Sequence, residues 1–99
     1  MKTLVAALAL AGFAIHSQDL SERARQLEMN GDGPGARTLL QQAANALPRL
    51  AEIRYHLGMV YAAEGKTEAA RAEFGHAILL AQGYAAAQTA LDRLPKSLT

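Results

Sequence analysis

The chain of 99 residues has no cysteine and no tryptophan, and only 5% of its residues are aromatic. Without cysteine, the sequence excludes disulfides, thiolate metal sites, thiol nucleophiles and lipidated cysteine anchors. With so few rings, a core must come from helices that approach closely. The 22 alanines fit this expectation, because alanine is the strongest helix former and adds almost no bulk. We therefore expect an all-α protein with a small core.

An excess of charge of one sign is also missing. The formal net charge is +1, and residues 17–50 carry four acidic and four basic side chains. Nucleic acids are bound by clusters of lysine and arginine that neutralise phosphates. No such cluster is present, so we expect no nucleic acid partner.

Residues 1–16 form an apolar segment with no charge between Leu4 and Ile15. Its length matches the apolar region of a secretory signal peptide and is too short to span a bilayer. We expect a cleaved signal peptide, which places the protein in the periplasm or outside the cell, and no stable transmembrane anchor. The alternative is an ordinary apolar helix, retained in a cytoplasmic protein.

The chain contains an internal repeat. Shifting the sequence by 34 positions aligns residues 17–50 with residues 51–84 without a gap, a period typical of helical repeat arrays. Small residues align with small ones and large residues with large ones. The pairs are Ala24 with Gly58, Gly31 with Gly65, Ala36 with Ala70, Ala43 with Ala77, Leu27 with Tyr61, and Leu40 with Phe74.

The second unit resembles the tetratricopeptide repeat (TPR) family through residues at the family's spacing, namely Leu57, Gly58, Tyr61, Gly65, Ala70, Phe74 and Ala77. The first unit is a weaker copy, with Pro48 where the family commonly has proline. Arg54 stands where a tryptophan is frequent. The resemblance implies a TPR-like α-solenoid of two helix-turn-helix repeats, residues 17–50 and 51–84.

Local sequence details predict how these elements begin and end. Gly58 and Ala70 allow close helix approach, and Thr67 is expected to cap the second helix of its unit. Gly33 and Gly35 suggest a looser turn in the first unit. Residues 85–95 are expected to form a capping helix that Pro95 ends, followed by a tail at residues 96–99.

A narrower resemblance concerns the segments Leu47-Pro48 and Glu52-Ile53-Arg54-Tyr55-His56-Leu57. They look like the C-terminal repeats of bacterial TPR proteins associated with exopolysaccharide export and exosortase systems. The likeness covers about half of the chain, and the lipoprotein cysteine common in those proteins is missing. It suggests a bacterial envelope setting.

Catalytic chemistry has little support in the sequence. The candidates are His16, His56 and His76, with no cysteine and no serine in a nucleophile motif beside them. Glu73 and His76 have the Glu-x-x-His spacing of di-iron bundles, but the second motif that this chemistry needs is missing. We expect no metal, no cofactor and no enzymatic activity.

The TPR resemblance implies that the first helix of each repeat lines a concave groove. The groove residues most expected to bind a partner are Arg25, Met29, Glu52, Tyr55, His56 and Met59. Methionine adapts to different ligands and tyrosine is amphipathic, which suits a peptide or helix. Two simpler interpretations stay open. Met29 and Met59 can pack between the repeats, and His56 can merely contact Glu52.

Two functions from different classes follow. The first is a non-catalytic interaction module that binds a peptide or helix of a partner protein in the groove. The chaperone-type carboxylate clamp is absent, because Ser21, Arg25 and His56 occupy its positions. The second is a self-associating structural unit, since two complete repeats fall below the three usually needed for a stable stack.

Overall fold

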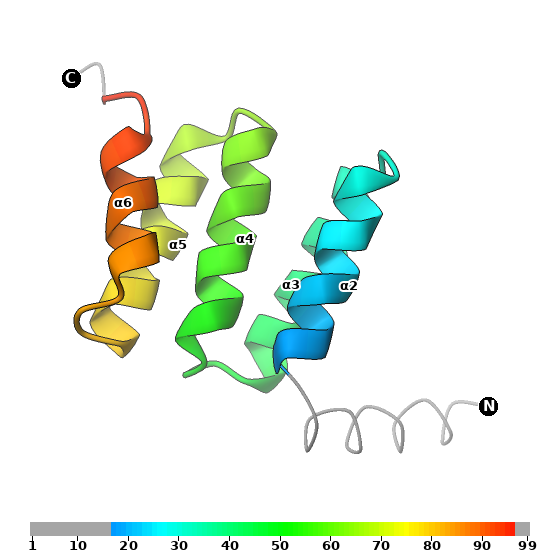
Figure 1. Cartoon of the computed structure of the whole chain (residues 1–99), viewed down its shortest axis with the longest axis horizontal. Coiled ribbons are helices and arrows are strands. Elements are labelled where there is room, and N and C mark those ends of the chain that lie inside the picture. Colours follow the sequence, from blue (N-terminus) through cyan, green and yellow to red (C-terminus); the bar gives the residue numbers. More distant parts are fainter. Residues whose placement is uncertain (1–16, 97–99) are drawn as a thin grey trace.

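The computed structural model describes residues 17–96, and in this part of the chain every regular element is an α-helix (Figure 1). The helices are α2 (Ser17–Met29), α3 (Gly33–Ala46), α4 (Ala51–Ala63), α5 (Thr67–Leu80) and α6 (Ala85–Arg93). The expectation of an all-α protein is therefore confirmed here. Within the same residues, no helix has both the length and the hydropathy needed to cross a membrane. The expected signal peptide at residues 1–16 lies outside the described residues, as do residues 97–99.

The helix bounds repeat with the period of the sequence. Both α2 and α4 have 13 residues, and both α3 and α5 have 14. Each helix of the second pair begins 34 positions after its counterpart. The turns repeat as well, since Gly31 and Gly65 have φ angles of 85° and 78°. This left-handed conformation favours glycine, so the same residue type ends the first helix of each hairpin in the same way.

The helices lie in two layers. In Figure 1, α2, α4 and α6 are on the near side and run in the same direction, whereas α3 and α5 lie behind them. Each helix packs against the next one in the chain, and α2 also contacts α4 directly. We call the side formed by α2, α4 and α6 the front face.

The tightest contact in the core joins α4 to α5. A Cβ atom on Gly58 would lie 2.6 Å from Cε1 of Phe74, whose side chain is 1% exposed. The ring therefore occupies space that any larger residue at position 58 would need. In the first hairpin the equivalent pair is Ala24 and Leu40, both buried. The smaller apolar side chain on the rear helix α3, compared with α5, thus leaves room for a larger residue on the front helix.

Polar contacts connect successive helices. The guanidinium of Arg37 on α3 donates to Glu64 just after α4, and Gln41 Nε2 donates to the Tyr61 hydroxyl at 2.8 Å. One period later, Arg71 on α5 donates to the backbone oxygen of Pro95 just after α6, at 2.7 Å. The two equivalent arginines thus connect each rear helix to the segment that follows the next front helix.

Two predictions about helix starts are wrong. Gly33 and Gly35 do not form a looser turn, because α3 begins at Gly33, at the same repeat position as α5. Asp32 caps this helix by accepting from the Gly35 amide at 2.8 Å, and a Cβ at position 35 would collide with that carboxylate. Thr67 is the first residue of α5 rather than its cap, and Lys66 precedes it without a side-chain capping bond.

The last helix, α6, ends at Arg93, two residues before Pro95, whereas the sequence predicted a helix over residues 85–95. Leu94 has the extended conformation, with ψ of 147°, that the ring of a following proline imposes. Asp92, Arg93 and Lys96 are exposed. Arg93 is the last residue of α6 and Lys96 lies beyond it, so both cations are near the end of the helix that favours positive charge.

We predict that Gly58→Ala lowers the free energy of unfolding by about 1 to 2 kcal/mol, because overpacking against Phe74 outweighs the gain in helix propensity. In the background of Phe74→Leu, which recreates the Ala24 and Leu40 pair, Gly58→Ala should cost little or nothing. Urea unfolding of the four proteins measures this coupling. The same loss in both backgrounds would show that the ring is not the obstacle.

Candidate partner-binding groove

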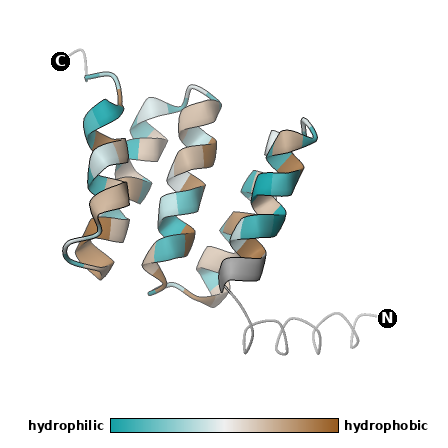
Figure 2. Cartoon of the chain, viewed as in Figure 1, coloured by the Kyte–Doolittle hydropathy of each residue, from teal (hydrophilic) through white to brown (hydrophobic). Residues whose placement is uncertain are grey.

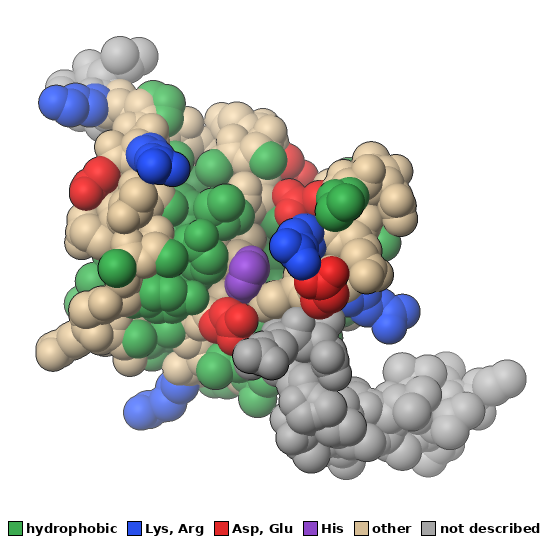
Figure 3. Space-filling view, in the orientation of Figure 1, with side chains coloured by type: hydrophobic (Ala, Val, Ile, Leu, Met, Phe, Trp, Pro, Cys, Tyr) green, Lys and Arg blue, Asp and Glu red, His purple; other side chains and the backbone are tan. Residues whose placement is uncertain are grey.

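The front face carries two hollows that meet at α4. Figure 3 shows an apolar surface over α4 and α6, with a histidine at its edge on the side of α2. Figure 2 shows that much of α2 is hydrophilic on this side, whereas the lower half of α6 is hydrophobic. Tyr55 and Met59 line both hollows. These two α4 residues therefore separate the two hollows, and we call them the ridge.

The larger hollow lies between α4 and α6 and has a volume of about 540 Å³. It is mostly apolar, and its lining consists of Tyr55, Met59, Ala62, Phe74, Ala86, Thr89, Ala90, Arg93, Leu94 and Pro95. The Tyr55 ring is fixed by neighbouring rings, with centroid distances of 5.9 Å to Phe74 and 5.5 Å to Tyr84. Such contacts stabilise one ring position, so this hollow has a preformed wall.

The smaller hollow lies between α2 and α4 and has a volume of about 140 Å³. Its lining is Ser21, Ala24, Arg25, Glu28, Leu40, Tyr55, His56 and Met59. Ser21 is 7% exposed, and its hydroxyl has no hydrogen-bond partner within the described part of the chain. Buried polar groups are nearly always paired, so this hydroxyl is an exception within the described residues.

Charge differs between the two sides of the front face. On α2, Arg25 pairs with Glu22, and Glu28 lies one turn further along. The pKa of Glu28 is raised, first by burial and then by the nearby negative charge of Glu64. On the other side, Arg93 lines the larger hollow, and Lys96 follows Pro95 in the sequence.

His56 occupies a half-buried position beside Tyr55. The two rings meet edge to face with centroids 5.1 Å apart, and His56 Nε2 lies 3.9 Å from Oε2 of Glu52. Burial lowers the pKa of His56 below 6.5, and the positive charge of Arg25 adds to this effect, while the negative charge of Glu52 opposes it. At neutral pH the imidazole is therefore uncharged and offers one donor and one acceptor to the groove.

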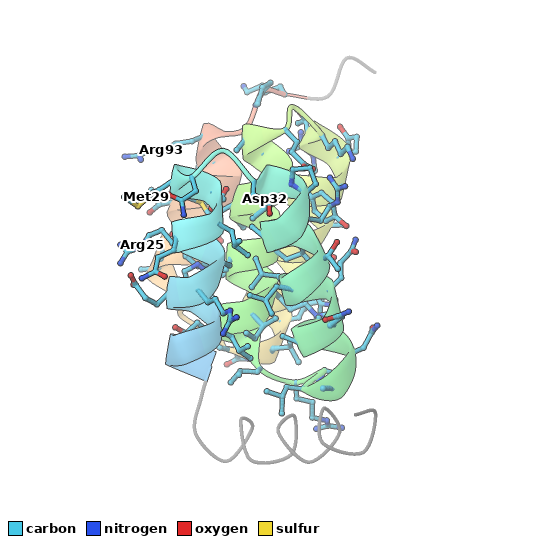
Figure 4. The ribbon with its side chains drawn as sticks, turned by 90° about the vertical axis from the view of Figure 1, so that its right-hand side faces the viewer. Arg25, Met29, Asp32 and Arg93 are labelled. Carbon is cyan, nitrogen blue, oxygen red and sulfur yellow. The ribbon has the colours of Figure 1, made fainter. Side chains whose placement is uncertain are left out.

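The structure brings together four of the six residues expected to bind a partner. Arg25, Tyr55, His56 and Met59 line the smaller hollow. Glu52 lines neither hollow and instead lies near His56. Met29 lines neither hollow and is 78% exposed, so the interpretation that it packs between the repeats is wrong. Figure 4 shows Arg25 and Met29 projecting on the same side as Arg93.

Sequence reasoning missed the contribution of α6, which was expected only to cap the solenoid. Its residues Thr89 and Arg93 form the far wall of the larger hollow. The repeat itself contained the information, because the same shift of 34 positions that aligns the two hairpins also aligns Tyr55 with Thr89 and Met59 with Arg93.

The Glu73 and His76 pair that the sequence offered for metal chemistry lies on α5. Between residues 17 and 96, no three histidine or carboxylate side chains converge on one point that could hold a metal ion. Glu73, from the Glu-x-x-His spacing, pairs with Arg54 at 3.3 Å. Comparisons with protein-family models, curated proteins and solved structures gave no match for this chain. Function is therefore inferred from the geometry and charge of the front face.

We predict that the imidazole of His56 titrates with a midpoint below 6.5, measured by NMR from its ring protons. Because the unfolded chain binds this proton more readily than the folded one, stability should fall as the pH decreases from about 7 through this range. His56→Gln should remove this part of the pH dependence. A midpoint above 6.5 would mean that the charge of Glu52 outweighs burial.

Proposed function

We propose that the chain is a TPR-like α-solenoid whose front groove binds a peptide or helix of a partner protein without catalysing a reaction. The fold part of this proposal is supported by two hairpins with the same helix lengths and the same glycine turns, one period apart. A period of 34 residues with paired helices is characteristic of this repeat class. The front groove is the pair of hollows that meet at Tyr55 and Met59.

The observation that carries the binding function is the exposed apolar ridge between the hollows. Met59 lies centrally on the middle front helix and is still 43% exposed, and Tyr55 beside it is only half-buried. Covering the exposed part of Met59 is worth about 1 kcal/mol. Beside this ridge, the half-buried and neutral His56 ring provides a polar group for a ligand backbone. Apolar anchors with a few placed polar groups are typical of peptide sites.

Self-association by end-to-end stacking is less well supported. Where α4 buries Leu57 and Val60 against the first hairpin, α2 has Arg23 and Gln26 at the equivalent positions, and both are exposed. At the other end, α6 has Asp92 at the position equivalent to Gly58. Stacking another helix on these faces would desolvate charged and polar groups, which is costly unless each one finds a partner.

We predict that replacing both Tyr55 and Met59 by alanine weakens peptide binding at least about tenfold, because it removes both apolar anchors. The probes are peptides selected from a random displayed library against the folded wild-type chain, with affinities measured by calorimetry. Leu79→Ala is the matched control, since Leu79 is 83% exposed but lies on α5, away from both hollows.

Since Tyr55 also supports neighbouring rings, Met59→Glu provides a second variant that leaves this packing in place. Circular dichroism verifies that every variant keeps its helical content. Selected peptides that bind the two groove variants as tightly as the wild type would refute the groove assignment, as would a selection that yields no binding peptide.

A further inference from the structure

The three front helices present equivalent positions side by side. Arg25 of α2, Met59 of α4 and Arg93 of α6 follow one another at intervals of one repeat, and each of them lines a hollow. Figure 4 shows that Arg93 lies higher than Arg25 along the direction of the helices. The line from Arg25 to Arg93 therefore crosses α4 obliquely, and the charge pattern can be followed along it.

The two arginines at the ends of this line have different surroundings. Arg25 has a glutamate one helical turn to either side, Glu22 and Glu28, so the α2 rim is negative in sum. Arg93 has Ala90 one turn before it. The neighbouring residue Asp92 accepts a hydrogen bond from Gln88 at 3.0 Å. Asp92 lies on the helix face equivalent to that of Gly58, so its carboxylate does not belong to the row of Arg93. The α6 rim is thus positive, and the ridge between the two rims is apolar.

The hollows also indicate how a ligand lies. They follow one another from α2 to α6 and are separated by Tyr55 and Met59, both on α4. A ligand that fills both must cross α4 rather than lie along it. Packed helices are about 10 Å apart and an extended chain advances about 3.3 Å per residue, so at least about six residues connect the two rims.

We propose that the groove binds an extended peptide segment with opposite charges at its two ends. Its basic end lies on the α2 rim at Glu22 and Glu28, its apolar middle covers Tyr55 and Met59, and its acidic end lies at Arg93. This inference rests on the proposed peptide-binding function and adds the chemistry and orientation of the partner. Glu28 fits the arrangement, because its half-buried carboxylate lies near Glu64 and no cation of the described chain is paired with it.

The test uses four synthetic peptides of equal length with the same apolar centre. Two carry lysines at one end and glutamates at the other, in the two possible chain directions, one is basic at both ends, and one is acidic at both ends. We expect the wild-type protein to bind one of the two polarised peptides about threefold to tenfold more tightly than the two symmetric ones. At 1 M salt, where charges are screened within about 3 Å, this preference should largely vanish.

Reversing the charge of one rim at a time should switch the preference. Glu28→Lys makes both rims positive, so the peptide that is acidic at both ends should become the best ligand. Arg93→Glu makes both rims negative and should favour the peptide that is basic at both ends. Glu68→Lys and Arg49→Glu are matched controls, because these exposed residues carry the same charge changes away from both hollows, and they should keep the wild-type preference.

The outcomes separate this inference from the proposed function. Equal binding of all four peptides by the wild type and the rim variants would overturn the charge-polarised ligand while leaving peptide binding intact. If no peptide binds, and the library selection also fails, the groove function itself is refuted. Sedimentation at several concentrations tests whether a second copy of the chain occupies the groove. A dimer that is lost in each rim variant alone, but returns when the two variants are mixed, would overturn the peptide and favour the second copy as occupant.

Discussion

The groove depends on the close approach of Gly58 to the ring of Phe74. Because residue 58 has no side chain, the ring fits under α4, where it is buried and also reaches the larger hollow. Tyr55 then packs on this ring and on Tyr84, which fixes it as a wall of the groove. A missing side chain in the core thus determines where an aromatic side chain stands on the surface, and it links the packing of the second hairpin to the site.

The two hairpins share one backbone pattern but differ in what they present. The first has the Ala24 and Leu40 pair, and its front helix carries glutamates and arginines. The second has the aromatic cluster, and its front helix carries Tyr55, His56 and Met59. Arg37 and Arg71, at equivalent positions, each donate a hydrogen bond to the segment that follows the next front helix, while the surface chemistry of the two hairpins differs. In repeat proteins the packed helices commonly keep one arrangement while the exposed side chains differ between repeats.

The sequence predicted the all-α class, and the glycines at 31 and 65, which the repeat aligns, follow the first helix of each hairpin with the same positive φ. It failed at helix starts, where capping depends on backbone geometry that residue types do not fix. Asp32 became a cap because Gly35 leaves room for its carboxylate, whereas Thr67 entered the helix. Neither arrangement follows from composition.

For the site, the TPR resemblance indicated which helix faces border the groove but not the level of each side chain along it. Tyr55, His56 and Met59 line a hollow, whereas Glu52 and Met29, expected beside them, line neither. The walls from α6 were missed for another reason. Its run of alanines gives no functional signal in the sequence. These residues line the larger hollow only because small side chains leave space beside the larger ones of α4.

The position of α4 explains how the described helices form two adjoining hollows. It is the front helix with another front helix on each side, so each of its flanks borders one hollow. Its side chains can therefore be half-buried without a ligand, as Tyr55 and His56 are, and still present an open face. Partial burial restricts their rotamers in advance, which lowers the entropy cost of binding. Two hairpins and one further helix are the smallest set that gives a middle front helix this environment on both sides.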